Sequence, residues 1–243
     1  MEIHLQPDIL GVFAGIPISN SFLLSILGGT ILFLGGFFAV RHFKQIPEKL
    51  QNISELMIEQ MMSFTESVVA SRQQAKEFLP IVGSFFLFIL LNNWLGVFPG
   101  VGTVGFFIGE KFVPFLRSAA SDLNVTIALA LVSVVTANIY GIRKLGIFSH
   151  LSKFFTFTKG PIYFFVGLME LISEFAKILS FSARLFGNMF AGKILLLVVM
   201  TLVPLLAPLP FFALEIFIGF VQALVFSALT LIFLKIATEQ ASH

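Results

Sequence analysis

Residues 180–193 read SFSARLFGNMFAGK, and this stretch places Arg184, Asn188 and Lys193 in the middle of a long apolar run. A charged side chain near the centre of a bilayer costs about 2.5–3.5 kcal/mol on insertion scales. A membrane protein therefore carries such a residue where it meets a partner or lines a water path, and Arg184 is the first candidate for a functional residue.

The composition of the whole chain is that of a polytopic membrane protein. Of 243 residues, 57% are hydrophobic and 12% are charged, and the mean hydropathy is +0.98, whereas a soluble domain carries about 25% charged residues. The net charge of +2 is too small to indicate nucleic-acid binding. The absence of cysteine excludes disulfides and cysteine-ligated metals. No basic region precedes the first apolar run, so no cleavable signal peptide is expected.

Five apolar stretches predict an all-α fold with five membrane crossings in a single membrane domain spanning residues 1–243. The crossings are expected at residues 21–40, 79–99, 122–141, 162–203 and 211–237, because about 20 residues cross the hydrocarbon. Pro80 is expected in the first turn of the second crossing and Asp122 at the N-cap of the third. Residues 50–72 carry apolar side chains at helical spacing with carboxylates opposite, which predicts an amphipathic helix. That helix is expected on the membrane surface, against a partner, or packed on its own chain. The four histidines (His4, His42, His150 and His243) are scattered and form no ligand motif.

The fourth crossing is unusually long. Its 42 residues lie between Pro161 and Pro204 without an internal proline. As one helix it measures about 63 Å, about twice the hydrocarbon thickness. We prefer one strongly tilted helix over two spans, because Gly187 and Gly192 are weak helix breakers.

Basic residues in the links predict the orientation. The links at 41–78 and 141–159 hold five and four of them, whereas the 100–121 link holds two and residues 1–20 hold none. Because basic links stay in the cytoplasm, the N-terminus is expected outside and the C-terminus inside.

On a helical wheel of about 100° per residue, Glu170, Lys177 and Asn188 fall within about 40° of Arg184, and Lys193 falls opposite. The nearest acids on the same helix, Glu170 and Glu174, are two to four turns away. Arg184 is therefore expected to meet an acid on another chain.

The last crossing carries Glu215 and Gln222, which are seven residues apart and share one face. Lys193 and Glu215 flank the turn between the last two crossings, where antiparallel neighbours can form an ion pair. Whether such a pair is only structural stays open at this point.

Several motifs resemble one family. ARLFGNMFAG at 183–192, SDLNVTIALAL at 121–131, NNWLGVFPG at 92–100 and FVQAL at 220–224 are similar to stretches of subunit a of F-type ATP synthases, the stator of a membrane rotor. The resemblance covers the chain from about residue 20 onward. It implies a non-catalytic subunit without a cofactor. The expected location is a bacterial plasma membrane, with an organelle inner membrane as the less favoured alternative. The implied partners are the c-ring, the peripheral-stalk b subunits, the lipid bilayer and, indirectly, the soluble F1 sector.

The resemblance also implies a role for each residue of the site. Arg184 matches the essential arginine that faces a carboxylate of the ring, and Gln222 matches the glutamine beside it. The outer half-channel is expected to be lined by Asn188, Lys193 and Glu215, and the inner one by Glu170, with Glu174 and Lys177 secondary. Lys193 departs from the family, where glutamate or histidine is more usual, and whether it relays protons or only pairs with Glu215 stays open. The coupling ion, proton or sodium, also stays open.

The alternative class is a self-contained ion channel or secondary transporter. Intramembrane charges suit it equally well. The absence of an internal repeat and of paired broken helices counts against it.

Overall fold

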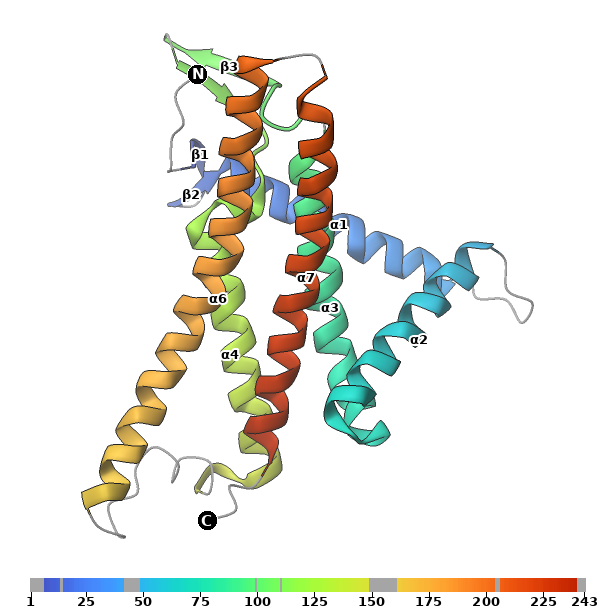
Figure 1. The fold of residues 1–243 in the computed structure, drawn as a ribbon, viewed down its shortest axis with the longest axis vertical. Helices are drawn as coiled ribbons and strands as arrows, with labels where there is room; N and C mark the ends of the chain where they lie inside the picture. Colours follow the sequence, from blue (N-terminus) through green and yellow to red (C-terminus); the bar gives the residue numbers. More distant parts are fainter. Residues whose placement is uncertain are drawn as a thin grey trace.

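The computed structural model describes residues 7–13, 15–41, 49–98, 100–109, 111–148, 161–203 and 206–239 (Figure 1). The four histidines, Pro204 and most of the basic link before the fourth crossing lie outside these ranges. The helices are α1 (Asn20–Arg41), α2 (Lys49–Val69), α3 (Arg72–Val97), α4 (Leu123–Leu145), α6 (Pro161–Leu202) and α7 (Pro208–Thr238). All of these except α2 are long and apolar enough to cross a membrane. The predicted all-α, five-crossing membrane fold is therefore confirmed.

α6 is continuous over its 42 residues, so the single long helix is confirmed and the broken alternative is wrong. It lies beside α7, and the two are joined by the short connection at one end (Figure 1). α4 packs on both α6 and α7, while α3 packs mainly on α7. α1 crosses this bundle and contacts α3, β2 and η1.

Two short hairpins and a 3₁₀ turn lie within segments that the sequence predicts only as links. β1 (Ile9–Phe13) pairs with β2 (Ile16–Ser19), and β3 (Gly105–Ile108) pairs with β4 (Lys111–Pro114), both antiparallel. η1 (Ala119–Ser121) then leads into α4. The second hairpin brings Gly105 so close to Val113 that an added Cβ would clash with the Val113 carbonyl oxygen.

α3 begins seven residues before the predicted crossing, and the prediction for Pro80 is therefore wrong. Pro80 lies inside the helix and not in its first turn. The extension is stabilised by burial, because Ala75 and Phe78 are 0% and 1% exposed. Phe78 belongs to a core cluster with Val69 of α2 and Leu234 of α7.

A larger core cluster occupies the middle of the bundle. It gathers Phe85 and Ile89 of α3, Leu185 and Met189 of α6, and Phe226 of α7, among others. This cluster lines one side of α6 and fixes that side against its neighbours, so the opposite side of α6 faces away from the protein.

α2 is amphipathic, as predicted, and it does pack on its own chain. Its second half contacts α3 and α7, where Thr65 and Val69 are buried. Lys235 of α7 donates a hydrogen bond of 3.1 Å to the Val68 carbonyl in the last turn of α2. Cations are favourable at a helix C-terminus, so this contact ties α2 to α7. Ile53 and Leu56 in the first half stay exposed.

Candidate functional site

Arg184 lies on the side of α6 that faces away from the core. Its neighbours Leu185 and Ser182 are buried against α4 and α7, whereas Arg184 is exposed. Ser182 also shares a hydrogen bond of 3.1 Å with Thr126 of α4, which fixes the rotation of α6. Among the residues that the structure describes, Arg184 makes no hydrogen bond or ion pair.

An amide pair stands one turn from Arg184. Asn188 donates from Nδ2 to Oε1 of Gln222 at 2.7 Å, which joins α6 to α7. Gln222 is 4% exposed. Because residues four apart share a helix face, Asn188 brings Gln222 to the side of α6 that carries Arg184. The structure thus brings these three predicted site residues together.

Glu215 is buried on α7, and its surroundings differ from the prediction. Glu215 is 3% exposed, and neither of its carboxylate oxygens has a hydrogen-bond partner among the described residues. It packs against Gly192 of α6, where an added Cβ would stand 3.4 Å from Oε1. The ion pair with Lys193 that the sequence allows is not formed in the structure. The ammonium of Lys193 instead donates to Ser121 Oγ at 3.3 Å.

The physical reason for this difference lies in the loop before α4. η1 brings a hydroxyl to Lys193 from 72 residues away in the chain. No pattern in the sequence indicates that contact. Opposite charges suggest a pair such as Lys193 with Glu215, whereas nothing in the sequence marks a hydroxyl 72 residues away as the partner of Lys193.

A cluster of polar groups surrounds this loop, and sequence reasoning missed most of it. Asp122 caps α4 as predicted, since its Oδ1 accepts from the Asn124 N–H at 2.9 Å. Its other oxygen, Oδ2, accepts a short hydrogen bond from Ser21 of α1. Burial lowers the pKa of Arg117, while the nearby charges of Asp8 and Asp122 raise it. The one sequence feature that points to this cluster is the SDLNVT motif, which predicts Asp122 as the N-cap of α4.

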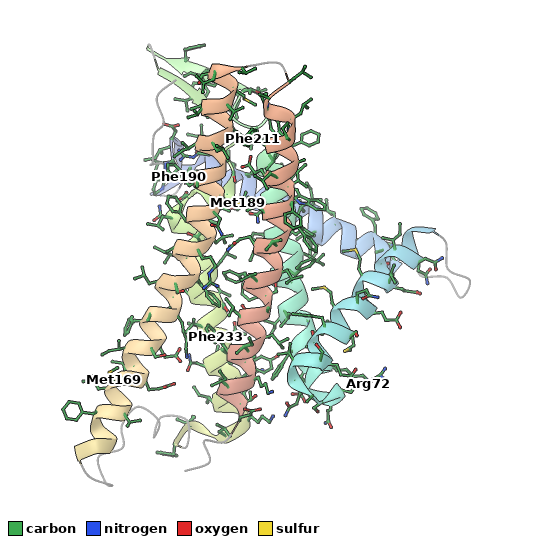
Figure 2. All side chains as sticks on the ribbon, viewed as in Figure 1. Arg72, Met169, Met189, Phe190, Phe211 and Phe233 are labelled. Carbon is green, nitrogen blue, oxygen red and sulfur yellow. The ribbon has the colours of Figure 1, made fainter. Side chains whose placement is uncertain are left out.

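A second charged cluster lies on the other side of Arg184 along α6. Lys177 donates to Glu174 Oε1 at 2.6 Å, and Asn138 of α4 donates to Glu174 Oε2 at 3.2 Å. The Lys177 ammonium also stands 5.0 Å from the centre of the Phe233 ring of α7. Figure 2 shows Phe233 between α6 and α7.

Glu170 is half-buried one turn before this cluster. Its carboxylate has no hydrogen bond or ion pair within the described ranges. It is about 21 Å from Arg184 along the helix axis at 1.5 Å per residue. Nearby Met169 lies on the part of α6 that extends beyond its neighbours (Figure 2) and is 63% exposed. The structure therefore keeps Glu170 apart from Arg184, although both were predicted on one face.

The arrangement can be stated in chemical terms. An exposed guanidinium sits between two groups of polar side chains on a helix long enough to cross a membrane. Within the described ranges, one group contains the Glu215 carboxylate, which has no hydrogen-bond partner, and the other contains the Glu174–Lys177 ion pair and Glu170. The arrangement combines a fixed positive charge with groups that can gain or lose a proton on either side of it.

Comparison with known proteins places the chain in a family. The family model described as "ATP synthase A chain" matches residues 22–235. An ATP synthase subunit a of Campylobacter jejuni subsp. jejuni serotype O:23/36 (strain 81-176) is 32% identical over 203 residues, covering 82% of this chain and 81% of the relative. A chloroplastic ATP synthase subunit a of Stigeoclonium helveticum is 33% identical over 231 residues, covering 94% and 88%. One from Gloeobacter violaceus (strain ATCC 29082 / PCC 7421) is 35% identical over 203 residues, covering 84% and 77%. The chain is a multi-pass membrane protein that belongs to the ATP synthase A chain family.

Proposed function

We propose that this chain is the stator subunit of an F-type ATP synthase membrane sector, and that Arg184 meets an ionised carboxylate on a rotating ring of c subunits. The observation that carries the proposal is an exposed arginine on a membrane-crossing helix with no acidic partner among the described residues. A guanidinium stays charged almost anywhere, and an unpaired charge in hydrocarbon is costly. A carboxylate on another chain removes that cost.

The coupling follows from the chemistry of a carboxyl group. A protonated carboxyl can face lipid, whereas an ionised one cannot. At about 4 Å and an effective dielectric near 20, its attraction to Arg184 is about 4 kcal/mol. That favours release of the proton as the ring site arrives, and it is small enough for the site to leave as the ring turns.

Two offset aqueous half-channels then load and unload the ring site from opposite sides of the membrane. The outer one contains Glu215, Asn188 and Lys193, with Gln222 beside Arg184. The inner one contains Glu170, with Glu174 and Lys177 nearby. Arg184 between them blocks direct leakage from one half-channel to the other.

The further partners are the peripheral-stalk b subunits and, through them, the soluble F1 sector. The chain itself performs no catalysis. The chain lies in a bacterial plasma membrane. Its N-terminus is outside and its C-terminus is in the cytoplasm, because the links rich in basic residues fall on one side.

The test is coupled ATP synthesis in vesicles that carry the reconstituted complex with Arg184→Ala. Synthesis and ATP-driven pumping should both be abolished while the complex still assembles, because Arg184 contributes no core packing. Arg184→Lys should rescue incompletely, since an ammonium is more strongly hydrated and is not a planar fork of donors.

Arg143→Ala is the matched control, because Arg143 is an exposed arginine in the last turn of α4. It should retain synthesis. Near-normal synthesis with Arg184→Ala would show that Arg184 is only a structural charge, and the proposal would then be wrong.

A further inference from the structure

Lys193 and Glu215 lie near each other in the interior without bonding. Each charge acts on the other electrostatically, yet both oxygens of Glu215 lack a hydrogen-bond partner in the described part of the chain. Opposite charges attract more strongly as they approach where burial lowers the effective dielectric, and Lys193 is half-buried beside the buried Glu215. Something therefore holds the ammonium away from the carboxylate.

The ammonium bonds to Ser121 instead. Its hydroxyl donates to the Ser118 carbonyl at 2.8 Å, which directs the lone pairs of Oγ elsewhere. One of these lone pairs accepts from the Lys193 ammonium at 3.3 Å. Ser121 is 1% exposed, so no bulk water competes for that position.

The position of Ser121 is itself fixed by its neighbour. Asp122 anchors the start of α4 through the Asn124 N–H and binds Ser21 of α1 through its other oxygen. The Asp122 N–H donates to the Ala119 carbonyl at 3.1 Å, which closes the 3₁₀ turn that contains Ser121. The first turn of α1 thus helps to set where the Lys193 ammonium lies.

We propose that Ser121 is a positioning residue that holds the Lys193 ammonium off Glu215, so that the Glu215 carboxyl stays free to gain and lose the transferred proton. This rests on the proposed function, in which Glu215 lines the outer half-channel. The groups facing Lys193 from the surrounding elements are Glu215 on α7, Ser121 in η1 and the charge of Arg117.

The first test is a double-mutant cycle of proton-driven ATP synthesis in reconstituted vesicles, with Ser121→Ala, Lys193→Met and the double variant. Ser121→Ala should lower the rate about tenfold, because hydrogen bonds to charged groups are worth about that factor. In the Lys193→Met background the same change should have no effect. Ser121→Thr keeps the hydroxyl and should restore most of the rate.

Ser227→Ala is the matched control. Ser227 is a buried serine of α7 that donates to the Ala223 carbonyl of its own helix at 2.8 Å. It should leave the rate within about twofold of the parent, as expected for sites that do not couple. Equal losses from Ser121→Ala in both backgrounds would mean that Ser121 only packs, and no loss in either background would mean that its bond to Lys193 is idle. Both results would overturn the proposal.

An infrared measurement separates this inference from the proposed function. The C=O stretch of the protonated Glu215 carboxyl is assigned by its loss in Glu215→Gln, and its intensity is read at pH 7 in the intact complex. Ser121→Ala should reduce the protonated fraction, because the released ammonium moves onto the carboxylate. An unchanged band would overturn the inference even if Arg184→Ala behaves as proposed. A reduced band would support the role of Ser121 even if Arg184→Ala leaves synthesis intact.

Discussion

Ala70 has a left-handed backbone, with φ of 57°, at the corner where α2 turns into α3. A non-glycine residue pays about 1 kcal/mol for this conformation, which glycine adopts freely. Ala70→Gly should therefore stabilise the corner by up to about 1 kcal/mol. The measurement is thermal unfolding of the detergent-purified complex.

The control for this prediction is Ala75→Gly, in the first turns of α3 and 0% exposed. It should lower the stability by about 0.5–1 kcal/mol, because glycine weakens a helix interior. If Ala70→Gly lowered the unfolding temperature as much as Ala75→Gly, backbone strain at residue 70 would not limit the stability of the corner.

Glu174 and Lys177 form an ion pair within α6. Their side chains are each 20% exposed, and Asn138 and Phe233 hold them on either side. Removing one charge leaves the other uncompensated, which is worse than removing both. Glu174→Gln and Lys177→Met should therefore each reduce the amount of assembled complex more than the double variant does.

The comparison pair is Lys235 with Glu239, which stand 3.9 Å apart with side chains 31% and 60% exposed. Exposed pairs contribute about 0–1 kcal/mol, so Glu239→Gln should leave assembly unchanged. Additive losses for Glu174→Gln and Lys177→Met would show that the two residues do not depend on each other.

At the scale of the elements, periodicity and length predicted the helices well and the links poorly. The 42-residue run between two prolines is α6 with almost the same ends. The start of α3 was missed because Arg72–Phe78 is polar in composition yet buries Ala75 and Phe78 through tertiary packing. The hairpin at 105–114 was missed because its strands are only four residues long.

In the candidate site, too, contacts along helix faces are predictable from the sequence, whereas contacts with links are not. Helix spacing predicts Asn188 on the face of Arg184, whereas Gln222 is expected beside Arg184 only from the family resemblance. The structure bonds these two amides to each other. The partner of Lys193 was not predictable, because Ser121 lies 72 residues away in an irregular turn. Contacts of this kind depend on how elements pack, and a single sequence carries no periodic signal for them.

At the scale of the whole molecule, the two ends of the bundle carry different links. The β3–β4 hairpin lies at one end, and the ends of α4 and α7 lie at the other (Figure 1). We expect the hairpin end outside and the other end in the cytoplasm.

Single cysteines test this orientation directly, since the chain has none. Thr103→Cys should react only with a membrane-impermeant maleimide added from outside. Lys144→Cys and Glu239→Cys should react only from the cytoplasmic side, and all three residues are exposed. If residue 103 labels from outside and residue 144 from the cytoplasm, labelling of residue 239 from outside would contradict an odd number of crossings.

The contact between the start of α1 and the loop before α4 has a consequence for the time course of synthesis. Asn20 and Ser21 are completely buried, and they bond to Pro114 and Asp122, 94 and 101 residues later in the chain. At about 5–20 residues per second, the ribosome needs roughly 5–20 s to deliver those partners. During that interval the first helix is already made, while the polar groups at its start still lack the partners they have in the finished protein. Until about half of the chain has been made, a chaperone or the insertion machinery has free access to residues that later become inaccessible.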